Sequence, residues 1–189
     1  MLEKLLSLDT QLLIYLNSFG SETYDGLWGI ITKQEYWTPI FLFLLYVIYT
    51  KIGLKQTLYV LLFIGVLVFV TDQITNFVKD TIQRPRPCNN PEINTIIRAV
   101  QTRTSFSFFS GHAANSLAVT TFLYLIFKDK IKYFGLFFIW PLVFAYSRIY
   151  LGLHYPLDIF TGYVCGFILG FITYKAYQYT FKEKIPNNI

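Results

Sequence analysis

Residues 147–158 read SRIYLGLHYPLD and place an arginine, a histidine and an aspartate directly before an apolar segment, 159–177. That segment has about the length of a membrane span, for which about 20 residues are needed. Ionisable groups at the edge of a membrane segment often mark a functional site. The stretch therefore predicts a site at a membrane surface that contains Arg148, His154 and Asp158.

Two earlier stretches carry groups of the same kind. Residues 79–87 end in Arg-Pro-Arg-Pro, and residues 109–112 read FSGH. Both histidines of the chain, His112 and His154, lie in these stretches or in 147–158. We predict that the three stretches form one phosphate-handling site and that the rest of the chain builds its frame.

The composition indicates a membrane protein. Of the 189 residues, 54% are hydrophobic and 14% are charged, whereas an average soluble domain has about 25% charged residues. The net charge of +5 comes from lysines and arginines between apolar runs, with no dense basic arm. This favours a lipid bilayer over nucleic acid as the partner. The length fits a single domain, 1–189.

Apolar periodicity predicts an all-α polytopic bundle. Leucines at mostly helical spacing in 2–17 predict an amphipathic helix in the membrane interface, with a helix packed on a soluble partner as the alternative. Because Glu3 and Asp9 interrupt this pattern, we expect no signal peptide. About five transmembrane helices follow, at 40–52, 58–78, 113–127, 133–146 and 159–177.

Positive charges indicate the orientation only weakly. With five spans, seven lysines fall on one side and six basic residues on the other, so the positive-inside rule is nearly silent. If Lys79, Arg86 and Arg148 bind phosphate, they are left out of the positive-inside count. The lysine-rich side then has the excess of positive charge and is predicted to be cytoplasmic. We therefore expect a bacterial inner (cytoplasmic) membrane protein whose site faces the periplasm or the outside.

The residue types suit phosphate ester hydrolysis, which requires cations, an in-line nucleophile and an acid for the leaving oxygen. Lys79, Arg86 and Arg148 supply three cations. Pro85 and Pro87 flank Arg86 and fix the backbone that aims its guanidinium.

The remaining groups can divide the rest of the chemistry. Ser110 is a natural N-cap, and the free N–H groups of Gly111 and His112 would point at an anion. Asp158 lies four residues after His154 and can hold one ring nitrogen protonated, which leaves the other nitrogen as a nucleophile. His112, at the positive end of a helix, suits a general acid.

Each feature also has a structural interpretation. A lone histidine in an apolar frame is usually structural, an arginine in a loop usually anchors the interface, and a Ser-Gly pair usually only caps a helix. Their joint occurrence at three loop ends on one membrane face is much harder to explain in this way.

Three blocks of residues match the pattern of a known family. The first is a lysine followed after six residues by Arg-Pro: Lys79, Arg86 and Pro87. The second has Phe109 where the family usually has proline: Ser110, Gly111 and His112. The third matches in full: Ser147, Arg148, His154 and Asp158. The chain thus resembles the type 2 phosphatidic acid phosphatase superfamily, integral-membrane lipid phosphatases related to vanadium haloperoxidases.

The resemblance implies a role for each position. His154 would attack phosphorus to form a phosphohistidine, Asp158 would orient it, and His112 would protonate the leaving group. The phosphoryl oxygens would be held by Lys79, Arg86, Ser110, the Gly111 N–H and Arg148. The family needs no metal and no cofactor, and the sequence offers no carboxylate cluster for Mg²⁺ and no Cys/His set for Zn²⁺.

The sequence leaves several candidates for the lipid substrate. An outward-facing site favours undecaprenyl diphosphate, with phosphatidylglycerol phosphate and a phosphate of lipid A as alternatives. A haloperoxidase-like enzyme and a non-catalytic lipid-binding protein are the alternatives from other classes. No obligate protein partner is evident.

Overall fold

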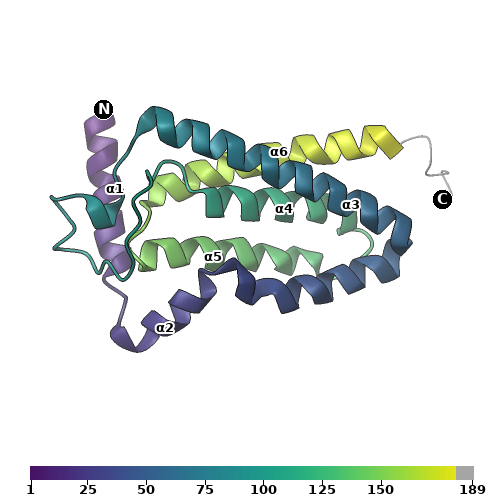
Figure 1. Ribbon diagram of the computed structural model, residues 1–189, viewed down its shortest axis with the longest axis horizontal. Helices are drawn as coiled ribbons and strands as arrows, with labels where there is room; N and C mark the ends of the chain where they lie inside the picture. The colour runs from purple at the N-terminus through teal and green to yellow at the C-terminus, as the bar shows by residue number, and fades with distance from the viewer. Residues whose placement is uncertain (182–189) are drawn as a thin grey trace.

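The computed structural model describes residues 1–181, and the regular elements in this range are all helical. In chain order they are α1 Leu2–Asn17, α2 Glu22–Ile31, η1 Gln34–Trp37, α3 Thr38–Ile82, η2 Pro87–Asn89, α4 Gly111–Phe127, η3 Phe134–Phe138, α5 Ile139–Tyr150 and α6 Pro156–Phe181. Figure 1 shows α3, α4, α5 and α6 side by side, with α1 running across one end of the bundle. The predicted all-α bundle is thereby confirmed.

The element α3 is two helices that meet at Gly53. This glycine has φ 73° and ψ 169°, a conformation that costs little without a Cβ. The chain reverses there, at the end of the bundle remote from α1 (Figure 1). The two halves correspond to the first two predicted spans, 40–52 and 58–78.

The helices differ in length and hydropathy. Within residues 1–181, Gln34–Asn89 and Pro156–Phe181 are long and apolar enough to cross a membrane, whereas Gly111–Phe127 and Phe134–Tyr150 are shorter. All five predicted apolar segments are helical. The number that crosses the bilayer stays a prediction.

Close contact between α4 and α6 depends on small residues. Glycines spaced four apart on α6 face α4, namely Gly162, Gly166 and Gly170. A Cβ on Gly166 would come within 2.3 Å of the carbonyl oxygen of Ala114. This is the small-residue spacing that lets membrane helices approach closely. It holds the start of α4 against the start of α6.

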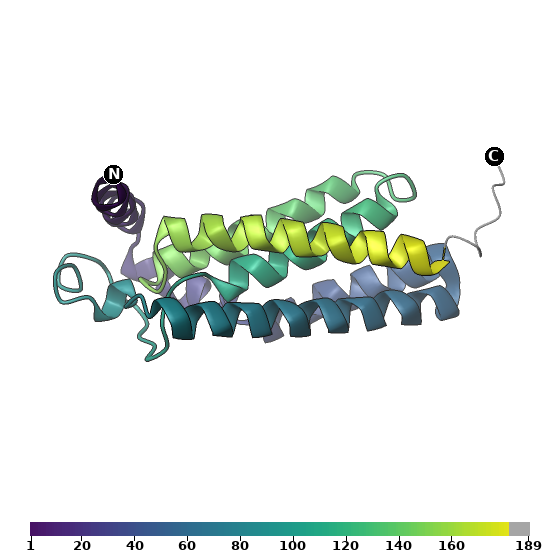
Figure 2. The same cartoon turned by 90° about the horizontal axis from the view of Figure 1, so that it is seen from above.

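The helix α1 buries polar residues and exposes leucines. Asp9 and Asn17 are buried, whereas Leu2, Leu8 and Leu12 are exposed. The Asn17 amide donates to the carbonyl oxygens of Arg98, Ile149 and Tyr150 at 3.2, 3.0 and 3.0 Å. A helix tied to the bundle by polar contacts, with its leucines turned outward, matches the predicted interfacial helix. Figure 2 shows α1 end-on, across the bundle end that carries the long loop 83–110.

Candidate active site

His154 lies at the centre of the site, in the loop that joins α5 to α6. It is 1% exposed. Its Nδ1 lies 3.2 Å from Oδ2 of Asp158, and its Nε2 lies 3.0 Å from Nη1 of Arg86. A guanidinium can only donate, so Nε2 accepts and Nδ1–H donates to Asp158. The neutral ring therefore has its lone pair on Nε2, the nitrogen that lies against the arginine.

Burial and the cations around His154 keep its ring neutral. Burial, followed by the charges of Arg86, Arg148 and Lys79, holds the pKa of His154 well below its usual value of 6.5. At neutral pH the ring is thus an unprotonated base surrounded by positive charge. This environment attracts a phosphate and keeps the nucleophilic nitrogen unprotonated.

Arg86 is fixed by hydrogen bonds as well as by its prolines. Its Nε donates to the Ser105 carbonyl oxygen at 2.7 Å, and its Nη2 donates to Ser105 Oγ at 2.9 Å. Its Nη1 also donates to the Leu153 carbonyl oxygen at 2.9 Å. Burial lowers the pKa of Arg86 below 12.5, but a guanidinium stays charged at neutral pH. The orientation of the Arg86 guanidinium, which we predicted from Pro85 and Pro87, therefore also depends on Ser105 in the long loop.

Arg148 belongs to α5 and is buried. Its Nη1 donates to Oγ1 of Thr32, at the end of α2, while its Nε has no hydrogen-bond partner among residues 1–181. Its carbonyl oxygen accepts the N–H groups of Leu153 and His154 at 2.9 and 3.3 Å. Arg148 thus shapes the His154 loop through its backbone and keeps side-chain donors, Nε among them, for a ligand.

The start of α4 has the predicted cap. Ser110 Oγ accepts the Ala113 N–H at 3.4 Å, and the Ser110 N–H donates to the Asp158 carbonyl oxygen at 3.0 Å. The His112 ring stacks on Phe144 of α5, with centroids 4.9 Å apart and planes 22° apart. The helix end that carries Gly111 and His112 is therefore held beside Asp158.

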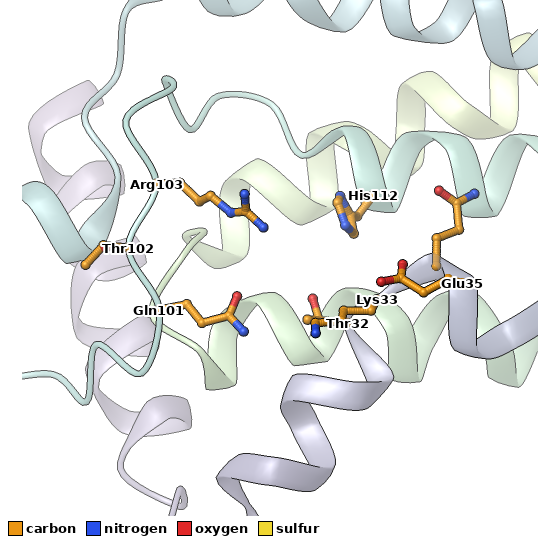
Figure 3. Close-up of a pocket in the computed structure, with 8 residues that line it drawn as sticks. Thr32, Lys33, Glu35, Gln101, Thr102, Arg103 and His112 are labelled. Carbon is orange, nitrogen blue, oxygen red and sulfur yellow. The ribbon is translucent and has the colours of Figure 1, made fainter.

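Two pockets meet at His112. The larger, about 500 Å³, opens between η1 and the long loop and includes Thr32, Gln101 and Arg103. In Figure 3, Arg103 from the loop and His112 from α4 point into this pocket from different sides. The smaller, about 230 Å³, is lined by Lys79, Gly111 and His112 together with polar residues of α3 and α4. The structure thus brings all eight predicted site residues to one end of the bundle.

Sequence reasoning missed Arg84, which joins the interfacial helix to this site. Its Nη1 lies 2.8 Å from Oδ1 of Asp158, and its Nη2 lies 2.7 Å from Oδ2 of Asp9. Its guanidinium also lies 3.7 Å from the ring centroid of Tyr155. Asp9 Oδ1 in turn accepts the Leu157 N–H at 2.8 Å. The first arginine of Arg-Pro-Arg-Pro and an acid in an apolar helix were visible signals, but nothing in the sequence paired them.

Comparison with known proteins gives a consistent result. The family model described as PAP2 superfamily matches residues 53–182. A lipid A 4'-phosphatase of Bacteroides thetaiotaomicron is 33% identical over 180 residues, which cover 92% of this chain and 79% of that protein. An undecaprenyl-diphosphatase of Sulfolobus acidocaldarius is 27% identical over 176 residues, 90% of this chain and 79% of that protein. The crystal structure of a PAP2-type phosphatidylglycerolphosphate phosphatase of Bacillus subtilis superposes with a TM-score of 0.69 at 20% identity, over 98% of this chain and 90% of that chain. This structural likeness concerns the fold.

Proposed function

The chain belongs to the PAP2 superfamily, and from this premise we propose that it hydrolyses the phosphate of a membrane lipid through a phosphohistidine at His154. The observation that supports this most directly is the pair of contacts on the His154 ring, Asp158 on Nδ1 and Arg86 on Nε2. They orient the ring and leave a nucleophilic lone pair beside a cation. A second cation, Arg148, holds the loop of His154 through its backbone carbonyl oxygen, so the ring lies among positive charges that a phosphate can balance.

The reaction follows from these positions. Nε2 of His154 attacks phosphorus while the bond to the leaving oxygen breaks. Burial and the nearby cations lower the pKa of His112, and the negative charge of the bound phosphate raises it again, so that the ring carries the proton that it gives to the leaving oxygen. Lys79, Arg86 and Arg148 stabilise the charge on the phosphoryl oxygens, with the Ser110 and Gly111 end of α4 as additional donor. Asp158 stabilises the imidazolium that forms. Water then attacks the phosphorus of the phosphohistidine while His112 takes a proton from that water, the bond between phosphorus and Nε2 breaks, and phosphate leaves.

The charge on the phosphoryl group is balanced here by side chains. Within the described range, 1–181, no three His, Cys, Asp or Glu residues gather as metal ligands would. The cations of Lys79, Arg86 and Arg148 take the place that Mg²⁺ has in many phosphoryl transfers. This leads to a test with chelators.

We expect the purified protein to release phosphate from lipid phosphates in excess EDTA. Orthovanadate should inhibit strongly, because it can adopt the five-coordinate geometry of the transferring phosphoryl group. Phosphate release with and without EDTA, and with increasing vanadate, measures both. Activity that vanishes with EDTA and returns with Mg²⁺ would show that the three side-chain cations are insufficient.

The comparisons change the order of the substrate candidates. Undecaprenyl diphosphate came first from the sequence alone, but the similarity to a lipid A 4'-phosphatase over 92% of the chain supports the 4'-phosphate of lipid A as the first candidate. Undecaprenyl diphosphate is the second, supported by the Sulfolobus relative. Initial rates on the two lipids, at equal mole fraction in the same micelles, decide between them.

We also propose that the site faces the periplasm or the outside of a bacterial inner membrane. The lysine-rich turn 128–133 and the bend of α3 lie at the bundle end remote from α1 and the site (Figure 1). Lysines flanking membrane helices favour the cytoplasmic side. The site end would then be outside.

A pair of single cysteines tests this orientation. We expect Asn94→Cys, exposed in the long loop, to react with a membrane-impermeant maleimide in intact spheroplasts, and Lys130→Cys, exposed at the other end, to react only after lysis. Both native cysteines are replaced by serine, so that only the introduced thiol can react. Cys88 lies next to the site in sequence but is only 7% exposed, so it is not itself used as the reporter. The opposite labelling pattern would place the site in the cytoplasm.

A further inference from the structure

The smaller pocket at His112 extends from the proposed phosphate site along α3 and α4. On α3 it is lined by Asp72, Thr75, Asn76 and Lys79, and on α4 by Asn115. Its volume, about 230 Å³, is below the roughly 300–1,000 Å³ that usually holds a whole small ligand. It therefore fits one part of a substrate, next to the reacting phosphate.

Three lining residues carry a buried polar atom without a hydrogen-bond partner among residues 1–181. These atoms are Thr75 Oγ1, Asn115 Oδ1 and Trp140 Nε1. Unpaired buried polar groups are costly and call for an explanation. The Asn115 amide nitrogen already donates to Oδ1 of Asp72 at 2.6 Å, so its carbonyl oxygen is the atom left over. The pocket thus offers hydrogen-bond acceptors as well as donors.

The pocket leads into an apolar groove. The two share Gln34, Val68, Val119 and Trp140, and the groove, about 320 Å³, continues between the two halves of α3. Going outward from His112, a ligand would meet first the cations, then mixed donors and acceptors, and then hydrocarbon side chains. That order matches a lipid whose phosphate is followed by a hydroxylated head and then by acyl chains.

We propose that this pocket binds the hydroxyl and amide groups that adjoin the scissile phosphate, and so selects phosphate monoesters of acylated amino sugars over polyprenyl diphosphates. The proposal rests on the phosphatase function proposed above. Sugar hydroxyls and amides both donate and accept, as Thr75 and Asn115 require. In a polyprenyl diphosphate the same position holds a second phosphate, which would lie near the Asp72 carboxylate, and beyond it a chain without polar groups.

The test compares selectivity among three substrates. They are an acylated glucosamine disaccharide that carries only a 4'-phosphate, undecaprenyl diphosphate, and a long-chain alkyl phosphate, a monoester without hydroxyl or amide. The variants are Thr75→Val and Asn115→Leu, which keep the approximate side-chain size. The first removes the unpartnered hydroxyl, and the second removes the whole amide, including the Nδ2 group that donates to Asp72. Thr120→Val is the matched control, because Thr120 is also buried with an unpartnered Oγ1 but does not line the pocket.

We expect each pocket variant to lower kcat/KM for the sugar lipid at least about tenfold relative to both other lipids, mainly through KM. Thr120→Val should leave the ratios unchanged. The ratio is independent of how much of a variant folds. Equal losses on all three lipids, or a wild type that prefers undecaprenyl diphosphate, would overturn the proposal and leave the phosphatase function intact. A wild type that hydrolyses none of the three would instead contradict the proposed function itself.

Discussion

Replacing His154 with alanine is expected to abolish turnover and the phosphoenzyme together. The imidazole supplies the attacking nitrogen, and no other neutral base lies between Arg86 and Asp158 in the described site. Loss of a nucleophile costs roughly 10⁴-fold or more in kcat. Steady-state hydrolysis and acid-quenched labelling with a ³²P-labelled substrate measure the two effects, and the elution profile in detergent verifies folding.

His112→Ala is the matched variant, because it removes the other histidine of the same site. Loss of a general acid typically costs about 10²- to 10⁴-fold on a lipid with a poor leaving group. A substrate with a good leaving group needs no acid, so His112→Ala should still form the phosphoenzyme from it. Labelled phosphohistidine recovered from His154→Ala would refute the assignment of the nucleophile.

The frame could be predicted because it depends on local signals. Apolar runs broken by charged turns indicate membrane helices, and Ser110 before the start of α4 indicates a cap. That the eight candidate residues meet at one end of the bundle could be predicted, because they lie at loop ends beside apolar segments and match a family pattern. Their chemistry requires cations and two histidines, and both histidines of the chain lie there.

What escaped prediction depends on contacts between distant segments. Arg84 pairs with Asp9, 75 residues away, and Asn115 pairs with Asp72, 43 residues away. Asp72 and Lys79 are seven residues apart and so lie on one face of α3, but this spacing could not reveal a pocket that needs α4 to complete it. The spacing of the glycines on α6 is visible in the sequence, but only the structure shows that these glycines allow close packing against α4.

Arg86→Gln is expected to shift the acid limb of the pH profile to higher pH, in addition to lowering the rate. Nε2 of His154 must be unprotonated to attack, so kcat/KM falls as that ring gains a proton. Burial and three cations hold the pKa of His154 well below 6.5. Removing the cation in contact with Nε2 favours the protonated ring, which raises this pKa and moves the acid limb upward.

The rate should also fall, by about 10²- to 10³-fold, because one donor to the phosphoryl oxygens is lost. The measurement is kcat/KM from pH 4 to 8 on one substrate, so that the ionisation of the phosphate itself is common to both enzymes. Arg98→Gln is the control, since Arg98 pairs with Asp25 at 2.9 Å instead of contacting the histidine. An acid limb that stays in place or moves to lower pH in Arg86→Gln would mean that Arg86 does not control the protonation of the nucleophile.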